Sequence, residues 1–193
     1  MTLVLTFVLL NTAFAVDGPP KPRSCCQRAS VNSQLREETG PVPGVKPEAA
    51  RSLFEALKRM QGTWQGTSTK GWTEEVSIRV IAGGSVVQFT SFDAHPNETM
   101  LTLIHMDVNR LLITHYCVAR NQPRLELTEI SDDGTRAVFT FLDATNLPSR
   151  DQGHMDKVVY HFTDSTSFSS QWTWYQNGAE RWLEKINLQR SPR

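Results

Sequence analysis

The chain has 193 residues, which is enough to bury a sizeable core within one domain. Its 20 Lys and Arg residues equal its 20 Asp and Glu residues in number. The chain therefore has no net basic field that would attract nucleic acid or an anionic membrane surface, and we expect no nucleic-acid partner.

The first 15 residues, MTLVLTFVLLNTAFA, carry no charge and end in Ala13-Phe14-Ala15. An apolar run followed by a small-x-small pattern is typical of a signal peptide and its cleavage site. The pattern predicts a signal peptide over residues 1–15 and a secreted or periplasmic location. A run of this length is too short to span a bilayer comfortably, so we expect no transmembrane span after cleavage.

Residues 16–46 are rich in proline, serine and charged residues. Such a composition cannot bury enough apolar surface to fold alone, which predicts a disordered linker. From Pro47 to Met60 the pattern changes, because Leu53, Phe54, Leu57 and Met60 fall on one helical face. With proline in the first turn and glycine after the end, this segment predicts a short amphipathic helix that opens a barrel domain over residues 47–193.

From Gly62 onward the apolar period is two, and turn signals recur at short intervals. They lie at residues 70–71, 83–84, 95–97, 107–109, 121–123, 132–134, 147–153, 163–165 and 177–178. These breaks divide the rest of the chain into about ten short strands, with no helical pattern between them. The spacing predicts an all-β fold, an antiparallel up-and-down β-barrel of about ten strands whose helix plugs or flanks one end.

The segment Gly62-Thr63-Trp64-Gln65-Gly66, directly after the predicted helix, resembles the Gly-x-Trp start of the calycin superfamily. That superfamily contains the lipocalins, the fatty-acid-binding proteins and the nitrobindin-type haem barrels. The block from Thr114 to Cys117, followed by residues 121–123, also resembles a signature of uncharacterised secreted bacterial barrels. These resemblances imply a ligand-holding barrel but no assigned activity.

Several polar residues share strand faces with apolar ones, where a barrel buries its side chains or a ligand. Glu74 has the parity of Val76 and Ile78, His154 that of Val158, and Glu184 that of Ile186.

The run from Leu101 to Leu125 carries two more such positions. A two-residue hairpin loop at Val108 and Asn109 would place His115 opposite Thr102 and His105 opposite Leu112. We expect His115 to point inward and His105 outward.

These residues suggest a binding module for a small apolar or amphipathic ligand in the barrel cavity. The candidate ligand-binding residues are His115, Tyr116, Asn121, Gln122 and Arg124 near the mouth, with Glu74, His154 and Glu184 on the apolar faces. No spacing in the sequence is typical of a metal site, and no cofactor is expected apart from the haem alternative below.

Three alternatives stay open. A strand histidine could ligate haem, as in a nitrobindin-type barrel. His115 could act as a general base oriented by Glu74 or Glu184 in an enzyme. The barrel could also recognise another protein through its rim or an exposed strand. No common hydrolase, phosphate-binding or dinucleotide motif is present to decide among them, and no catalytic residue is assigned.

Overall fold

The computed structural model describes residues 44–92 and 99–192. The predicted signal peptide, residues 1–15, and all but the end of the predicted linker, residues 16–46, lie outside the described residues. One helix and ten strands follow in chain order: α1 Pro47–Arg59, β1 Gly62–Ser68, β2 Thr73–Ile81, β3 Val86–Phe92, β4 Thr99–Asp107, β5 Arg110–Tyr116, β6 Gln122–Ile130, β7 Arg136–Thr145, β8 His154–Phe162, β9 Ser167–Gln176 and β10 Ala179–Arg190. A short 3₁₀ turn, η2 Ala82–Gly84, joins β2 to β3.

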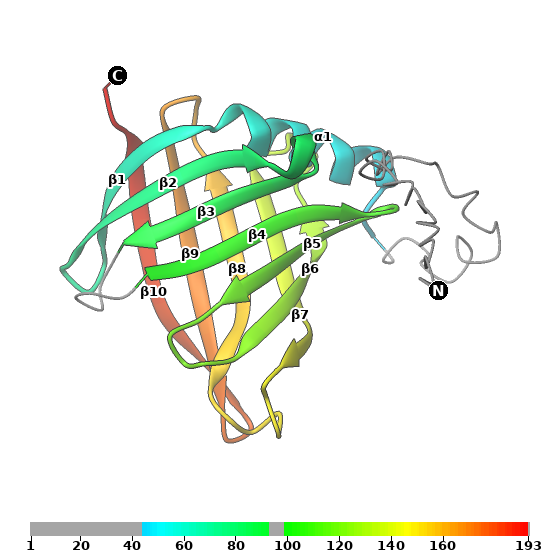
Figure 1. Ribbon diagram of the computed structural model, residues 1–193, viewed down its shortest axis with the longest axis vertical. Coiled ribbons are helices and arrows are strands. Elements are labelled where there is room, and N and C mark those ends of the chain that lie inside the picture. The colour runs from blue at the N-terminus through cyan, green and yellow to red at the C-terminus, as the bar shows by residue number, and fades with distance from the viewer. Residues whose placement is uncertain (1–43, 93–98, 193) are drawn as a thin grey trace, which may run out of the picture. The chain divides into compact units, whose positions relative to one another are not determined.

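Each strand pairs antiparallel with its neighbours in sequence, and β1 closes the sheet by pairing with β10. Figure 1 shows the strands curving round until β1 and β10 lie side by side. This confirms the predicted up-and-down barrel of ten strands. Because the topology simply alternates, every second turn lies at the same end. We call the end near α1 the helix end and the other end, with the turns after β1, β5, β7 and β9, the distal end.

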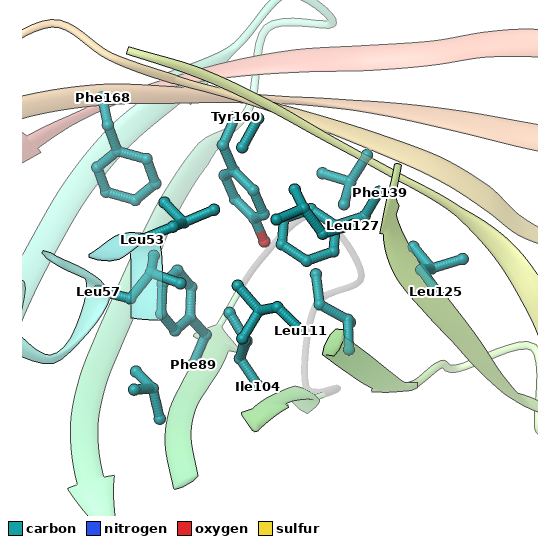
Figure 2. Packing of buried hydrophobic residues seen from close by; sticks show 14 of the residues in the cluster. Leu53, Leu57, Phe89, Ile104, Leu111, Leu125, Leu127, Phe139, Tyr160 and Phe168 are labelled. Carbon is teal, nitrogen blue, oxygen red and sulfur yellow. The ribbon is translucent and has the colours of Figure 1, made fainter. Parts of the chain in front are cut away.

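Helix α1 packs its apolar face into the helix end. Pro47 lies in the first turn and Lys58 and Arg59 in the last, positions that favour a helix start and complement the helix dipole. Leu53 and Leu57 are buried, and Figure 2 shows them facing the interior side chains of the barrel. The helix therefore supplies part of the core.

The predicted β4–β5 hairpin is confirmed. Asp107 pairs with Arg110, and Val108 takes a left-handed φ of 55° in the two-residue loop. The register places Thr102 opposite His115, as the loop length required.

The β5–β6 turn lies earlier than predicted. Gln122 begins β6, and Pro123 pairs with Ala144 of β7 within the strand. The turn runs over residues 117–121 instead, with a hydrogen bond from the Arg120 N–H to the Cys117 carbonyl. Proline is tolerated near the first residue of a strand, so it does not end the strand here.

Apolar side chains fill the interior near the helix end. Figure 2 shows Phe89, Ile104, Leu111, Leu125 and Leu127 gathered with Phe139, Tyr160 and Phe168.

Trp64 of β1 also belongs to this core. Its indole N–H donates to the Met60 carbonyl at 2.9 Å, and its ring meets Phe168 edge-on at 4.8 Å. The guanidinium of Arg190 lies 4.4 Å from the Trp64 ring centroid, so the ends of β1 and β10 are held together beside α1.

Candidate functional site

Buried polar side chains replace apolar ones in the barrel interior toward the distal end. The group comprises Ser68, Glu74, Thr102, His115, Ser170 and Glu184. The alternation of each strand carries these side chains inward, as the sequence pattern predicted for Glu74, His115 and Glu184. The distal part of the interior is therefore a polar layer beneath the barrel mouth.

His115 is held by two contacts and has one free ring nitrogen. Its Nδ1 lies 2.9 Å from the Thr102 hydroxyl on β4, and its ring packs at 4.8 Å against Trp172 of β9 on the far side of the barrel. Its Nε2 has no hydrogen-bond partner among the described residues. Burial lowers the pKa of His115 to about 4, so the imidazole is neutral at pH 7.

Two buried carboxylates lie on β2 and β10, the strands that flank β1. The hydroxyl of Ser68 donates to Glu184 Oε2 at 2.6 Å. Glu74 interacts electrostatically with Tyr160 of β8. Burial, reinforced by the negative charge of Glu74, raises the pKa of the Tyr160 hydroxyl and keeps it neutral.

His115 makes no hydrogen bond to Glu74 or Glu184, the two carboxylates that the sequence suggested as its partners. His115 Nδ1 is oriented by Thr102, while Nε2 contacts neither Glu74 nor Glu184 within hydrogen-bond reach. A base also works best with a pKa near the working pH, and the pKa of His115 is well below neutrality.

The space inside the polar layer is small. A cavity of about 20 Å³ is lined by Glu74, Ser91, Thr102, Tyr160 and other interior residues, including Trp172. This is room for about one water molecule, whereas pockets for small ligands measure roughly 300–1,000 Å³. Nε2 of His115 is a suitable ligand atom for haem iron, but the cavity beside it is far smaller than a haem.

His154 is fully buried beside an arginine clamp at the distal end. The guanidinium of Arg150 lies between the rings of Phe141 and Tyr175, 4.0 and 4.1 Å from their centroids, and donates to the buried Asp156 carboxylate. His154 packs against both rings, with centroids 4.8 and 5.5 Å away.

The same histidine is tied to the loop before it. His154 Nδ1 lies 2.6 Å from the Gln152 carbonyl, and burial lowers the pKa of the imidazole. Because a carbonyl only accepts, Nδ1 is the protonated nitrogen. The loop after β7 is thus fastened by Arg150 in its middle and by His154 at its end.

A groove of about 520 Å³ lies at the distal end, between the loops after β5, β7 and β9. We call it the distal groove. Its lining is formed by Ala119, Arg120, Asn121, Asn146, Pro148, Asp151, Gln152, Gly153, Trp174, Gln176 and Asn177. It offers many amide groups and a single aromatic ring.

Close contacts among Gly153, Trp174 and Asn121 hold part of the groove lining in place. A Cβ built on Gly153 would come within 2.2 Å of the Trp174 ring, so only glycine allows the indole to lie there. Asn121 is 4% exposed and donates from Nδ2 to the Gly153 carbonyl at 2.9 Å. Its Oδ1 is buried without a hydrogen-bond partner in residues 44–92 and 99–192.

The three loops are tied to one another by hydrogen bonds to backbone carbonyls. Asn146 donates from its side chain to the Arg120 carbonyl, and the Asn177 N–H donates to the Asp151 carbonyl at 2.9 Å. Arg120, Asn146 and Asn177 all have left-handed φ values, between 53° and 64°. Asparagine adopts this conformation readily in turns, so Arg120 is the residue whose backbone the surrounding contacts hold in a strained state.

The structure separates the residues that the sequence analysis grouped. His115, Glu74 and Glu184 lie in the interior, Asn121 lines the distal groove, and His154 is buried beside it.

The other three candidates lie elsewhere. Tyr116 is 45% exposed, and Arg124 forms an ion pair with Asp143 in which both side chains are largely solvent-accessible. Gln122 accepts a hydrogen bond from the Thr145 hydroxyl at 2.7 Å at the start of β6. None of these three joins the interior polar layer.

Sequence reasoning missed Trp174 and most of the loop residues of the groove. A signal was available, because the predicted turns at 121–123, 147–153 and 177–178 are alternate turns of an up-and-down barrel. Alternate turns lie at one end, so their asparagines and glycines could have been grouped from the sequence.

No known protein family matches the chain, and no curated protein matches it. Among solved structures, the chain is similar to the crystal structure of a protein of unknown function from the DUF3598 family of Nostoc punctiforme PCC 73102. The two share 10% sequence identity and a TM-score of 0.46, over 70% of this chain and 49% of that chain. The match spans about half of the neighbour's length and assigns no function.

Two classes of feature are not found in the part of the chain that the structure describes. No helix there has the length and apolar character needed to cross a bilayer. No group of three histidine, cysteine, aspartate or glutamate side chains there is arranged to hold a metal ion.

Proposed function

We propose that the protein is a binding module that holds a small amphipathic ligand in the distal groove. The observation that carries the proposal is a groove of about 520 Å³ in which one indole ring lies among side-chain amides on three mutually fastened loops. Polar groups in fixed positions orient a ligand beside an apolar surface, and here the amides supply the polar groups and the indole the apolar surface.

The groove suits a ligand better than the interior does. The interior cavity of about 20 Å³ would require several side chains to leave their packed positions before a ligand could enter. The groove already has ligand-sized volume, and its walls are held in place by hydrogen bonds between the loops.

The lining favours binding over catalysis. Its titratable side chains are Arg120 and Asp151, and no histidine or cysteine is among the lining residues. His115 lies in the interior polar layer and His154 is fully buried beside the groove, and neither is among the lining residues. The lining therefore supplies recognition groups without a nucleophile and base side by side.

The proposal is tested by recording backbone amide NMR spectra of the purified protein during titration with small amphipathic compounds. We expect shifts to concentrate in residues 117–121, 146–153 and 174–177. Gly153→Ala should abolish them by displacing Trp174, while Thr67→Ala, an exposed change on β1, should leave them intact. Shifts confined to the polar layer around His115, or unchanged shifts in Gly153→Ala, would contradict this site.

A calycin relationship and export are part of the same proposal. Gly62, Trp64 and Gly66 at the start of β1 support the first, and the uncharged residues 1–15 support the second. An exported binding module would meet its ligand outside the cytoplasm. Mass spectrometry of the protein recovered from the producing cells would show a chain cleaved after Ala15; a retained leader would contradict export by this route.

A further inference from the structure

We infer that the ligand of the distal groove is a neutral saccharide, bound through a pyranose ring. This inference rests on the proposed function and adds the chemical class of the ligand. It follows from the charge of the lining, the fixed indole ring and the arrangement of the amides.

The charge of the groove favours an uncharged ligand. Arg120 and Asp151 are its two charged side chains, they have opposite signs, and both are exposed. A phosphate or carboxylate ligand would need several donors of positive charge, and a cation would need an excess of carboxylates. Neither excess is present in the lining.

Trp174 supplies a flat apolar surface in a fixed place. Its ring rests on the backbone of Gly153, its indole N–H donates to Gln176 Oε1 at 3.3 Å, and part of the side chain stays accessible to solvent. An indole already anchored at its polar atom offers its carbon surface to a ligand. The C–H face of a pyranose ring is an apolar patch that suits one aromatic ring.

The amides suit hydroxyl groups, each of which both donates and accepts. Gln176 uses its oxygen on the indole, so its NH₂ group can donate. Asn146 uses its NH₂ group on the Arg120 carbonyl, so its oxygen can accept.

Asn121 also has an acceptor, the buried Oδ1, which has no partner in the described part of the chain. Leaving a buried acceptor unpaired is unfavourable, and a small displacement of the loops on ligand binding would let a hydroxyl or its bound water pair with it.

The test is saturation-transfer NMR on the purified protein with methyl glycosides of glucose, galactose and mannose and with their disaccharides. We expect at least one neutral glycoside to bind. Trp174→Ala should weaken it at least about tenfold and Trp174→Phe should weaken it less, because an aromatic surface remains. Trp72→Ala is the matched control, since Trp72 is a partly exposed tryptophan outside the groove, and should not change binding.

The outcomes separate the two proposals. Thermal melts and near-ultraviolet circular dichroism establish whether each variant is folded. If Trp174→Ala is not folded, the binding of Trp174→Phe is compared with that of wild type instead. Equal binding by the Trp174 and Trp72 variants would overturn the saccharide site. If glucuronate, glucosamine or short alkyl alcohols shift the groove signals while no neutral glycoside does, the ligand class is wrong and the binding groove stands. If no compound shifts them, both proposals fail.

Discussion

His115 shows how a polar residue can occupy the interior of a barrel in its neutral form. It is 3% exposed, its Nδ1 meets a hydroxyl, and its ring is covered by Trp172. Burial favours the neutral imidazole, because the charged form would lose its hydration. The residue therefore links protonation to folding.

Acidification should destabilise the fold through His115. Its pKa is about 4 in the folded state and near 6.5 when unfolded, so between these values the unfolded chain binds the extra proton. The free energy of unfolding should fall by up to about 1.4 kcal/mol per pH unit as pH drops through this window. Urea denaturation of wild type and His115→Gln at several pH values measures the difference.

At each pH, the free energy of unfolding of His115→Gln is subtracted from that of wild type. This removes the contribution of other groups, such as His154, because burial lowers the pKa of His154 as well. Identical pH dependence in the two proteins would show that His115 is not buried in the neutral form.

Among the elements, β1 is the strand whose sequence most closely reflects its place in the fold. It carries Trp64 to the helix end and Ser68 to the polar layer, and it pairs with both β2 and β10 to close the barrel. Gly66 lies between these residues, against Asn187 of β10. A Cβ built on Gly66 would lie 2.3 Å from the Asn187 carbonyl oxygen, a backbone atom that cannot turn aside.

Gly66→Ala should therefore strain the β1–β10 pairing. We expect a loss of about 1–3 kcal/mol in the free energy of unfolding, the usual cost of forcing an extra methyl group into a packed site. Thr67→Ala, the next residue on the exposed face of β1, should change stability by less than about 0.5 kcal/mol. Chemical denaturation of both variants checks this. Equal losses of stability would mean that the contact between β1 and β10 has room for the methyl group.

At the scale of the whole molecule, side chains fill most of the barrel interior. Side chains from opposite strands meet across the barrel, as Trp172 of β9 and His115 of β5 do, and leave a cavity of about 20 Å³. A packed core of this kind stabilises the fold and leaves room for about one water molecule.

Trp172→Ala should open the interior and make it a binding site. We expect a loss of about 3–5 kcal/mol in stability and a rise in melting temperature when indole is added to fill the vacated space. Wild type and Trp72→Ala should show no such rise. Indole stabilisation of wild type to the same degree would indicate that the interior opens without mutation.

The sequence by itself determined the helix over Pro47–Arg59, the ten strands and the inward position of His115, because amphipathic period, turn residues and hairpin length are local properties. The residue pattern along a single strand does not determine the volume of the interior, because that volume depends on which side chains meet across the barrel.

Only the tertiary structure decided that His115 faces Trp172, that Tyr116 and Arg124 are away from the polar layer, and that Trp174 and Gly153 form a groove. These relations join residues far apart in the chain. They arise from the closure of β1 on β10, which fixes how the described loops after β5, β7 and β9 lie beside one another.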